Sequence, residues 1–290
     1  MSDFHLTAQT RLAIVGCGKM GEAILAGALS AGVIEASNVV AVAPRQERRD
    51  YLEKTYGIAT AVSPYELHSF DINEDDICLL AVKPQVLAEV IPDVVSGTNN
   101  PLFVSIAAGI TLDTLQQMLG DDACIVRVMP NTPALVQKGC SLLSPGNACG
   151  ADQLAAIDQL FASFGSTHII EEKLQNAGSA LSGAGPAYFA LIINAMTRAG
   201  LTQGLKRDVA EELSVATMAG TAAMLEQLEM HPEQLIDMVT SPGGTTIAAL
   251  NELEDHKIRS AFTEAIEAAV FRAEELAWDT EADDEEDTEE

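Results

Sequence analysis

The sequence predicts an α/β N-terminal part, built on a doubly wound parallel sheet, and an all-α C-terminal part. From residue 11 to about residue 170, short runs rich in Val and Ile alternate with amphipathic segments, as in βαβ units. From residue 171 onward these runs end, and Ala, Leu, Met and Glu recur at helical spacing. A chain of 290 residues, 48% of them hydrophobic, is long and apolar enough for two modest domains.

Five apolar runs in the first part are the predicted strands. Each is short and apolar on both faces, which is typical of strands in a parallel sheet that helices cover on both sides. They span residues 12–16, 39–43, 77–82, 102–109 and 124–129. The amphipathic segments between them are the expected crossover helices.

The predicted organisation has four segments. An N-terminal extension (1–10) precedes the sheet domain (11–170), which is followed by the helical domain (171–278) and an acidic tail (279–290). The tail holds nine acidic residues and no basic one, so we expect it to be solvated and disordered.

The charge balance argues against an anionic macromolecular partner. Sixteen basic and 43 acidic residues give a net charge of -27, which repels phosphate backbones and anionic lipid. Residues 174–197 are uncharged and long enough to span a bilayer, but a break that contains glycine and proline at 183–186 interrupts them. We therefore expect no nucleic-acid partner, no membrane partner and no transmembrane segment.

Cysteine and histidine positions predict neither a disulfide framework nor a metal site. The five cysteines are an odd number without C-x-x-C spacing, and the five histidines form no pattern with Ser, Cys or paired acids. The N-terminus lacks the basic and apolar regions of a signal peptide. A cytoplasmic location is the expectation.

The helical domain is apolar on more than one side. Residues 187–195 and 213–225 consist almost entirely of apolar and small side chains. A helix that is apolar all round must be covered, and this domain is too small to cover several such helices by itself. We therefore expect a homo-oligomer assembled through the helical domain, with an ordinary monomeric bundle core as the alternative.

A glycine-rich turn joins the first predicted strand to the first predicted helix. Its residues are Gly16, Cys17, Gly18, Lys19, Met20 and Gly21. The first glycine permits a tight turn, the second lets a pyrophosphate approach the backbone, and the third lets helix and strand pack closely. The helix N-terminus adds free N–H groups and a positive dipole end. The motif in this context predicts dinucleotide binding in a Rossmann-type domain; the alternative is a turn without a ligand.

The end of the second predicted strand indicates which dinucleotide binds. A carboxylate there would bind the ribose 2′-hydroxyl of NAD, but the strand ends in Ala43, Pro44 and Arg45, with Arg48 and Arg49 following. Arginines beside this ribose favour the extra phosphate of NADP through charge-assisted hydrogen bonds. We predict NADPH as the cofactor, with NADH as a second candidate. A solvated helix face is the alternative explanation of the three arginines.

Two later strand ends add candidate cofactor contacts at the same edge of the sheet. They contain Ala81, Val82, Lys83 and Pro84 in one case, and Ala107 and Ala108 in the other. Ligands of such sheets lie at the carboxyl ends of the strands, and small residues are needed where a flat ring packs on backbone. The alternatives are a lysine that only pairs with surface carboxylates and a plain strand-to-helix turn. The stiff loop that follows, Arg127 to Ala134, fits a structural turn and a site loop equally well.

A cluster of hydroxyls and glycines lies in the helical domain. Residues 240–246 read TSPGGTT and lead directly into a helical pattern. Hydroxyls, glycines and a helix N-terminus together can bind a small carboxylate without a cation, which suits so acidic a chain. The alternative is an ordinary N-cap, although a cap needs only one hydroxyl.

Five motifs together resemble the pyrroline-5-carboxylate reductase family, in family order, and the resemblance extends from about residue 11 to residue 278. LSGAGPAY and TSPGGTT are the most specific of them. The motifs occupy residues 16–20, 81–84, 127–134, 181–188 and 240–246. The resemblance implies reduction of (S)-1-pyrroline-5-carboxylate to L-proline by hydride transfer from NAD(P)H to the carbon of the ring C=N.

The resemblance also implies residue roles. Thr246 would lie by the ring nitrogen as the catalytic hydroxyl, with Ser241, Gly244 and Thr245 around the substrate carboxylate and Glu172 as a nearby acid. An iminium accepts hydride more readily than an imine, so a group that stabilises the protonated nitrogen would lower the barrier. The family's usual unit is a homodimer interlaced through the helical domain, with each site completed by the second subunit.

Some positions depart from the family pattern. Met238 stands where some relatives carry Asn, Ser63 and Pro64 stand where Asn often contacts the nucleotide, and Ala184 replaces a serine. The changes at Met238 and at Ser63 and Pro64 affect individual contacts and not the reaction, and the change at Ala184 should be tolerated. Another imine reductase, a β-hydroxyacid dehydrogenase and a non-catalytic NADP(H) sensor are the alternatives; the dehydrogenase would need a lysine between residues 175 and 197, where there is none.

Overall fold

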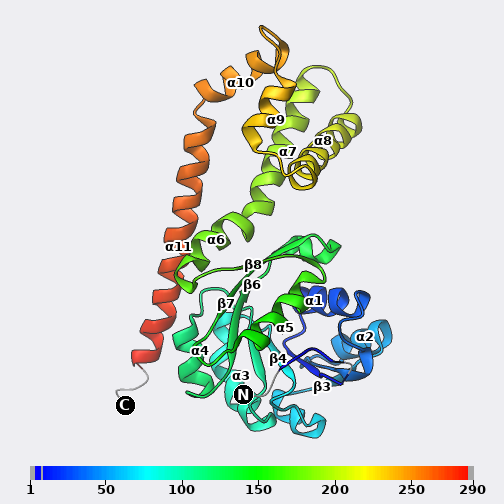
Figure 1. Ribbon diagram of the computed structural model, residues 1–290, viewed down its shortest axis with the longest axis vertical. Helices are drawn as coiled ribbons and strands as arrows, with labels where there is room; N and C mark the ends of the chain where they lie inside the picture. Colours follow the sequence, from blue (N-terminus) through cyan, green and yellow to red (C-terminus); the bar gives the residue numbers. More distant parts are fainter. Residues whose placement is uncertain (1–3, 8, 287–290) are drawn as a thin grey trace. The chain divides into compact units, whose positions relative to one another are not determined.

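The computed structural model describes residues 4–7 and 9–286 (Figure 1). Its contacts divide the chain into two compact units. The first unit comprises Met1–Gly183 together with Val270–Glu290, and the second comprises Ala184–Ala269.

The first unit contains one sheet in the order β3-β2-β1-β4-β5-β6-β7-β8. Neighbouring strands run parallel, except that β6 and β7 are antiparallel. The strands are β1 (Leu12–Val15), β2 (Val39–Val42), β3 (Ala59–Ala61), β4 (Ile77–Leu80), β5 (Leu102–Ser105), β6 (Ile125–Met129), β7 (Gly139–Pro145) and β8 (Gly165–Ile169). All five predicted strands are present, and the α/β fold class is confirmed. The runs predicted for β1, β2, β4 and β5 extend beyond the observed strands, and the extra residues lie in the segments that follow them.

Helices cover both faces of this sheet. Leu12 and Ile14 of β1 join one buried cluster with side chains of α1, α2 and α5, whereas Ala13 and Val15 join another with side chains of α3 and α4. This alternation explains why the strands are apolar throughout. The helices of this unit are α1 (Lys19–Ser30), α2 (Gln46–Tyr56), α3 (Pro84–Gly97), α4 (Leu112–Leu119), α5 (Ala151–Ala162) and α6 (Gln175–Ser182). Short 3-10 helices are η1 (Ala36–Asn38), η2 (Pro64–Phe70), η3 (Thr132–Val136) and η4 (Glu172–Leu174).

The antiparallel β7 differs from the expectation of an entirely parallel sheet. Only the short helix η3 separates β6 from β7. A parallel neighbour needs a crossover of about a dozen residues or more, so a connection this short brings the chain back antiparallel. The sequence analysis also missed β3 and β8, which are short and partly exposed.

The second unit is helical. It contains α7 (Gly185–Thr202), α8 (Arg207–Gln227), α9 (Pro232–Val239), α10 (Thr245–Asp255) and the beginning of α11 (Ile258–Glu286). Large apolar side chains on α7 and α8 are exposed, among them Phe189 (57%), Leu191 (70%) and Leu213 (53%). The unit therefore leaves uncovered the apolar surface from which an oligomer was predicted.

Helix α11 extends further than the sequence analysis expected. It continues to Glu286, through most of the acidic segment that was expected to be disordered from residue 279. No glycine or proline interrupts residues 258–286, and Ala and Glu favour helix. Residues 287–290 lie outside the described part of the chain.

A segment of this fold meets a test for membrane-spanning helices. Residues 172–202 are long and apolar enough, by length and composition, to span a membrane. The backbone is not one continuous α-helix there, since α6 ends at Ser182 and α7 begins at Gly185. A single such segment is weak evidence for a membrane protein, because helices of soluble proteins also meet the test.

Candidate active site

The glycine-rich turn has the geometry that dinucleotide binding requires. Gly16 has a φ of +87°, and a Cβ there would lie 2.5 Å from Cγ1 of Val82. A Cβ on Gly21 would meet Ala81 and Ile14 at 3.4 Å, so helix α1 packs closely on the sheet. A Cβ on the exposed Gly18 would meet only the carbonyl oxygen of Gly16, at 4.0 Å. A larger residue at Gly16 would therefore displace Val82, just after β4, whereas Gly18 leaves room for a ligand.

The N-terminus of α1 is free to bind an anion. Its N-cap is Gly18, and no side chain caps it. The N–H groups of a first helical turn have no partner within the helix. Together with the helix dipole they form a site for a phosphate. Cys17 lies in this turn as an unreactive thiol, because burial raises its pKa to about 11 against the opposing effect of Arg48.

The side chain of Arg48 is hydrogen-bonded to the glycine-rich turn. Its Nε donates to the carbonyl of Cys17 at 2.9 Å, and its Nη2 donates to the carbonyl of Gly18 at 3.3 Å. Nη2 also pairs with Oε2 of Glu22 at 2.6 Å. We call these three contacts of Arg48 the clamp. They hold the carbonyls of Cys17 and Gly18 on the side of α2.

Glu22 fixes the position of the Arg48 side chain in that clamp. Besides Arg48, its carboxylate accepts hydrogen bonds from the hydroxyls of Tyr51 at 2.9 Å and Tyr56 at 2.8 Å. Burial by itself would raise the pKa of Glu22, but these donors, Arg48 foremost, lower it overall. The sequence analysis missed this network, because its members lie 26 to 34 positions apart along the chain.

The three arginines after β2 differ in whether their side chains are free to bind a ligand. Arg49 is buried and donates to the carbonyls of Ala43 at 2.7 Å and Pro44 at 2.8 Å. Arg45, the residue before α2, is exposed, and its side chain makes no hydrogen bond or ion pair within the described part of the chain. It lines a concavity of about 260 Å³ with Glu47, Arg48 and Tyr51. Of the three, Arg45 is the arginine that is free to bind a ligand.

The other predicted cofactor contacts lie at the same edge of the sheet. Residues 81–84 directly follow β4, and residues 107–108 lie just beyond β5, so both are at the carboxyl ends of neighbouring parallel strands. Lys83 is exposed and forms no ion pair with any described carboxylate. It thus does not act as the surface charge partner that was the alternative. Ala107 is buried, whereas Ala108 is exposed.

Glu172 and Asn131 form hydrogen bonds between separate segments of the first unit. Oε1 of Glu172 accepts from the backbone N–H of Leu112 at 2.6 Å and from Nη1 of Arg127 at 2.9 Å. Asn131 donates to the carbonyl of Ser182 at 2.9 Å and accepts from the N–H of Cys140 at 2.8 Å. The loop after β6 therefore has a structural part, and the implied role of Glu172 toward substrate stays a prediction.

The TSPGGTT segment leaves most of its hydroxyls unused. Thr240 donates to the carbonyl of Ile236 at 2.7 Å, but the hydroxyls of Ser241, Thr245 and Thr246 make no hydrogen bond with any described residue. Helix α10 begins after Gly244 with no side-chain cap. The hydroxyls therefore do not serve as the ordinary cap that was the alternative.

Two glycines shape that segment. Gly243 has a φ of +66°, which favours glycine, and a Cβ on Gly244 would collide with Oγ of Ser241. Met238, one of the departures from the family pattern, is 57% exposed on α9. Ser63 precedes η2, whose first residue is the buried Pro64.

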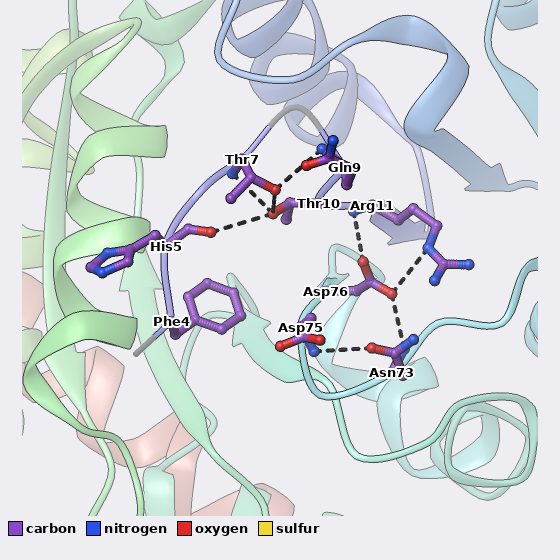
Figure 2. A pocket seen from close by; sticks show the side chains of 9 residues that line it. All are labelled: Phe4, His5, Thr7, Gln9, Thr10, Arg11, Asn73, Asp75 and Asp76. Atoms are coloured by element: carbon purple, nitrogen blue, oxygen red, sulfur yellow. Dashed lines mark hydrogen bonds and ion pairs between the residues drawn. The ribbon is translucent and has the colours of Figure 1, made fainter. Parts of the chain in front are cut away.

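A separate polar pocket lies at the opposite edge of the sheet. It has a volume of about 340 Å³ between the N-terminal segment and the loop before β4 (Figure 2). Asp76 there accepts from the N–H of Arg11 at 2.7 Å and of Asn73 at 3.0 Å, and pairs with Nε of Arg11 at 3.2 Å. Since its buried carboxylate is fully engaged, this pocket offers little for catalysis. Among the described residues, no group of three or more His, Cys, Asp or Glu side chains could hold a metal ion.

Comparison with known proteins identifies the family. The chain is 42% identical to the pyrroline-5-carboxylate reductase of Synechocystis over 266 residues, which cover 92% of this chain and 98% of that protein. The chain belongs to the pyrroline-5-carboxylate reductase family. The predicted resemblance is confirmed, and so is the class of enzyme, an NAD(P)H-dependent oxidoreductase.

Family models and solved structures agree with this assignment. A model described as pyrroline-5-carboxylate reductase dimerisation matches residues 172–276, and one described as NADP oxidoreductase coenzyme F420-dependent matches residues 11–109. The pyrroline-5-carboxylate reductase of Coxiella burnetii is 31% identical, with a TM-score of 0.84, over 92% of this chain and 98% of that one. The pyrroline carboxylate reductase of Plasmodium falciparum, solved with NADP bound, is 29% identical, with a TM-score of 0.80, over 93% and 99%. These matches do not support the β-hydroxyacid dehydrogenase alternative.

Proposed function

We propose that this protein reduces (S)-1-pyrroline-5-carboxylate to L-proline, with the dinucleotide at the Gly16–Gly21 turn and the substrate at the TSPGGTT segment. The observation that carries the proposal is the relation to a pyrroline-5-carboxylate reductase along almost the whole of both chains. When bound, NADPH supplies the hydride. The residues of this chain bind and orient the cofactor and the substrate, and they stabilise the charge on the substrate.

The cofactor half of the site rests on the turn and on Arg45. The uncapped N-terminus of α1 receives the pyrophosphate. Arg45, exposed and without a protein partner among the described residues, binds the 2′-phosphate that distinguishes NADPH from NADH. Lys83, Ala107 and Ala108 lie farther along the same edge, toward the ring that carries the hydride.

The substrate half rests on the N-terminus of α10. Its uncapped N–H groups and the hydroxyls of Ser241 and Thr245 bind the substrate carboxylate. The hydroxyl oxygen of Thr246 accepts a hydrogen bond from the protonated ring nitrogen, which keeps the more reactive iminium form. Thr246 is half-buried, which strengthens such a bond relative to bulk water.

A homodimer in the cytoplasm is the state that we propose. Exposed apolar side chains of α7 and α8 lie within residues 172–276, the part of the chain that matches the dimerisation model. A second subunit covers that surface and, as the family relation implies, completes each site. Subunit contact also accounts for the apolar residues 172–202 without a membrane.

The test measures initial rates of NADPH and NADH oxidation with DL-pyrroline-5-carboxylate, and identifies proline by chromatography. We compare wild type with Arg45→Asp and with Lys54→Asp, which makes the same charge change at the exposed far end of α2. We expect proline, a preference for NADPH in wild type and in Lys54→Asp, and its loss by about tenfold or more in Arg45→Asp. Absence of proline with folded enzyme would contradict the proposed reaction, and an unchanged preference in Arg45→Asp would contradict the role of Arg45.

A further inference from the structure

A small cavity in the first unit lies next to the predicted cofactor edge. Its volume is about 90 Å³, and residues from the segment after β5, from β6, from α6 and from α11 line it. One water takes about 30 Å³ of the liquid, so the cavity suits a group of a few non-hydrogen atoms and not a whole ring. The polar and edge residues that line it are Ala108, Gly109, Arg127, Gln175, Asn176 and Ser179.

Gln175, which lines this cavity, has an unused hydrogen-bond acceptor. The residue is 1% exposed, and its Nε2 donates to Oγ of Ser144 at 2.9 Å and to the carbonyl of Leu142 at 3.4 Å. These bonds hold Nε2 against β7. Oε1 is buried without a hydrogen-bond partner in the described part of the chain. A buried acceptor is rarely left so, because burial removes its bonds to water.

Arg127, which also lines the cavity, has unused donors. It is 8% exposed, and Nη1 donates to Oε1 of Glu172 at 2.9 Å. Its other guanidinium N–H groups bond to no described residue. Since the Glu172 carboxylate offsets the guanidinium charge, the cavity as a whole is close to neutral. The amide of Asn176 and the hydroxyl of Ser179 are likewise unused among the described residues.

This combination selects one class of ligand group. A carboxylate would meet the lone pairs of Gln175 Oε1 and the charge of Glu172, and an ammonium would meet the guanidinium of Arg127. A neutral group that presents a donor and an acceptor side by side avoids both conflicts. A primary carboxamide does so, with its N–H donating to Gln175 and its C=O accepting from Arg127.

We propose that this cavity binds the carboxamide of the nicotinamide ring, with Gln175 as the residue that recognises its NH₂ group. The inference rests on the proposed function, because it takes its ligand from the dinucleotide assigned there. Ala108, which we predict to contact the cofactor, lines the cavity. The cofactor thus supplies the carboxamide beside the residues that complement it.

The test is a binding measurement, by calorimetric titration, with three oxidised cofactors. NADP+ and its thionicotinamide analogue keep the NH₂ group, whereas the 3-acetylpyridine analogue replaces it with a methyl group. We expect wild type to bind the first two about fivefold to tenfold more tightly than the third, the effect of one buried hydrogen bond. Gln175→Met is expected to bind all three alike, and both proteins should bind adenosine 2′,5′-bisphosphate, which lacks the ring, equally.

Ser144→Ala is the matched control, because it removes a partner of Nε2 and leaves Oε1 in place. It should keep the wild-type preference. Equal affinities of the three cofactors in wild type would overturn the proposal even if Gln175→Met did not fold, and so would a preference that persists in folded Gln175→Met. Failure of the proposed reaction would appear separately, as absence of proline, since these titrations need no substrate.

Discussion

At the scale of single residues, a polar side chain can bind a ligand only if it is not already hydrogen-bonded within the protein. Thr240 and Thr246 belong to the same short segment, but the hydroxyl of Thr240 is bonded to its own helix and that of Thr246 is not. Arg45 and Arg48 differ in the same way. Residue type therefore identifies candidate ligand-binding residues, and the hydrogen bonds in the structure show which of them are available to a ligand.

Thr246→Val tests the catalytic hydroxyl, because valine keeps the shape and removes the oxygen. We expect kcat/KM for pyrroline-5-carboxylate to fall about tenfold to a hundredfold, since a hydrogen bond to a charged group is lost. The dissociation constant for NADPH, measured by calorimetry, should stay the same. Thr221→Val, whose hydroxyl bonds only to its own helix, serves as control. An equal loss of NADPH binding would argue against the assignment.

At the scale of elements, α2 supports the turn that opens α1. Arg48, Tyr51 and Tyr56 all come from α2 and meet at Glu22 of α1, while Arg48 also holds two turn carbonyls. With the carbonyls held there, the free N–H groups in the first turn of α1 are left for the pyrophosphate. The clamp should therefore affect every dinucleotide alike.

Arg48→Met tests this positioning role. We expect the dissociation constants of NADPH and NADH, measured by calorimetry, to rise by the same factor, about threefold to tenfold, with the ratio between them unchanged. Arg45→Asp is the contrast, because it should change that ratio. A selective loss of NADPH binding in Arg48→Met would show that Arg48 binds the 2′-phosphate instead.

The same variant has a predicted pH dependence. The pKa of Glu22 is lowered in the folded protein, so its pairing stabilises the fold above the ordinary pKa of glutamate, about 4.3, and is lost as the pH falls through the lowered value. Thermal melts should therefore separate wild type from Arg48→Met at neutral pH and converge in acid.

At the scale of the whole molecule, assembly is the main consequence of the helical unit. Few of its side chains are buried, and large apolar ones on α7 and α8 are exposed. Surface of this kind is stable in water when a second copy covers it. The match of residues 172–276 to a dimerisation model points the same way.

Leu191→Glu tests that assembly. Leu191 is 70% exposed on α7, and a buried unpaired carboxylate at an interface is strongly unfavourable. Sedimentation velocity should show smaller particles than wild type, with loss of activity if a second subunit completes each site. Val95→Glu, on an apolar residue of α3 that is 44% exposed, should leave the assembly intact. Unchanged assembly in Leu191→Glu would place the interface elsewhere.

The sequence by itself determined the features that are local along the chain. A strand, a glycine-rich turn and a helix follow one another within residues 12–30, and the hydroxyl cluster lies within seven residues, 240–246. Strand periodicity, turn chemistry and helix ends depend on neighbours in sequence, so they could be predicted, and with them five of the eight strands, the helical half and the family.

Only the tertiary structure decided how partners far apart in sequence satisfy one another. It commits Arg48 to Glu22, 26 positions away, and Glu172 to Arg127, 45 positions away, which leaves Arg45 and the Oε1 atom of Gln175 unpaired. It also reverses β7, because the connection from β6 is short. Hydrogen bonding is saturable and acts at about 3 Å, so which group stays free for a ligand depends on spatial neighbours that no local pattern records.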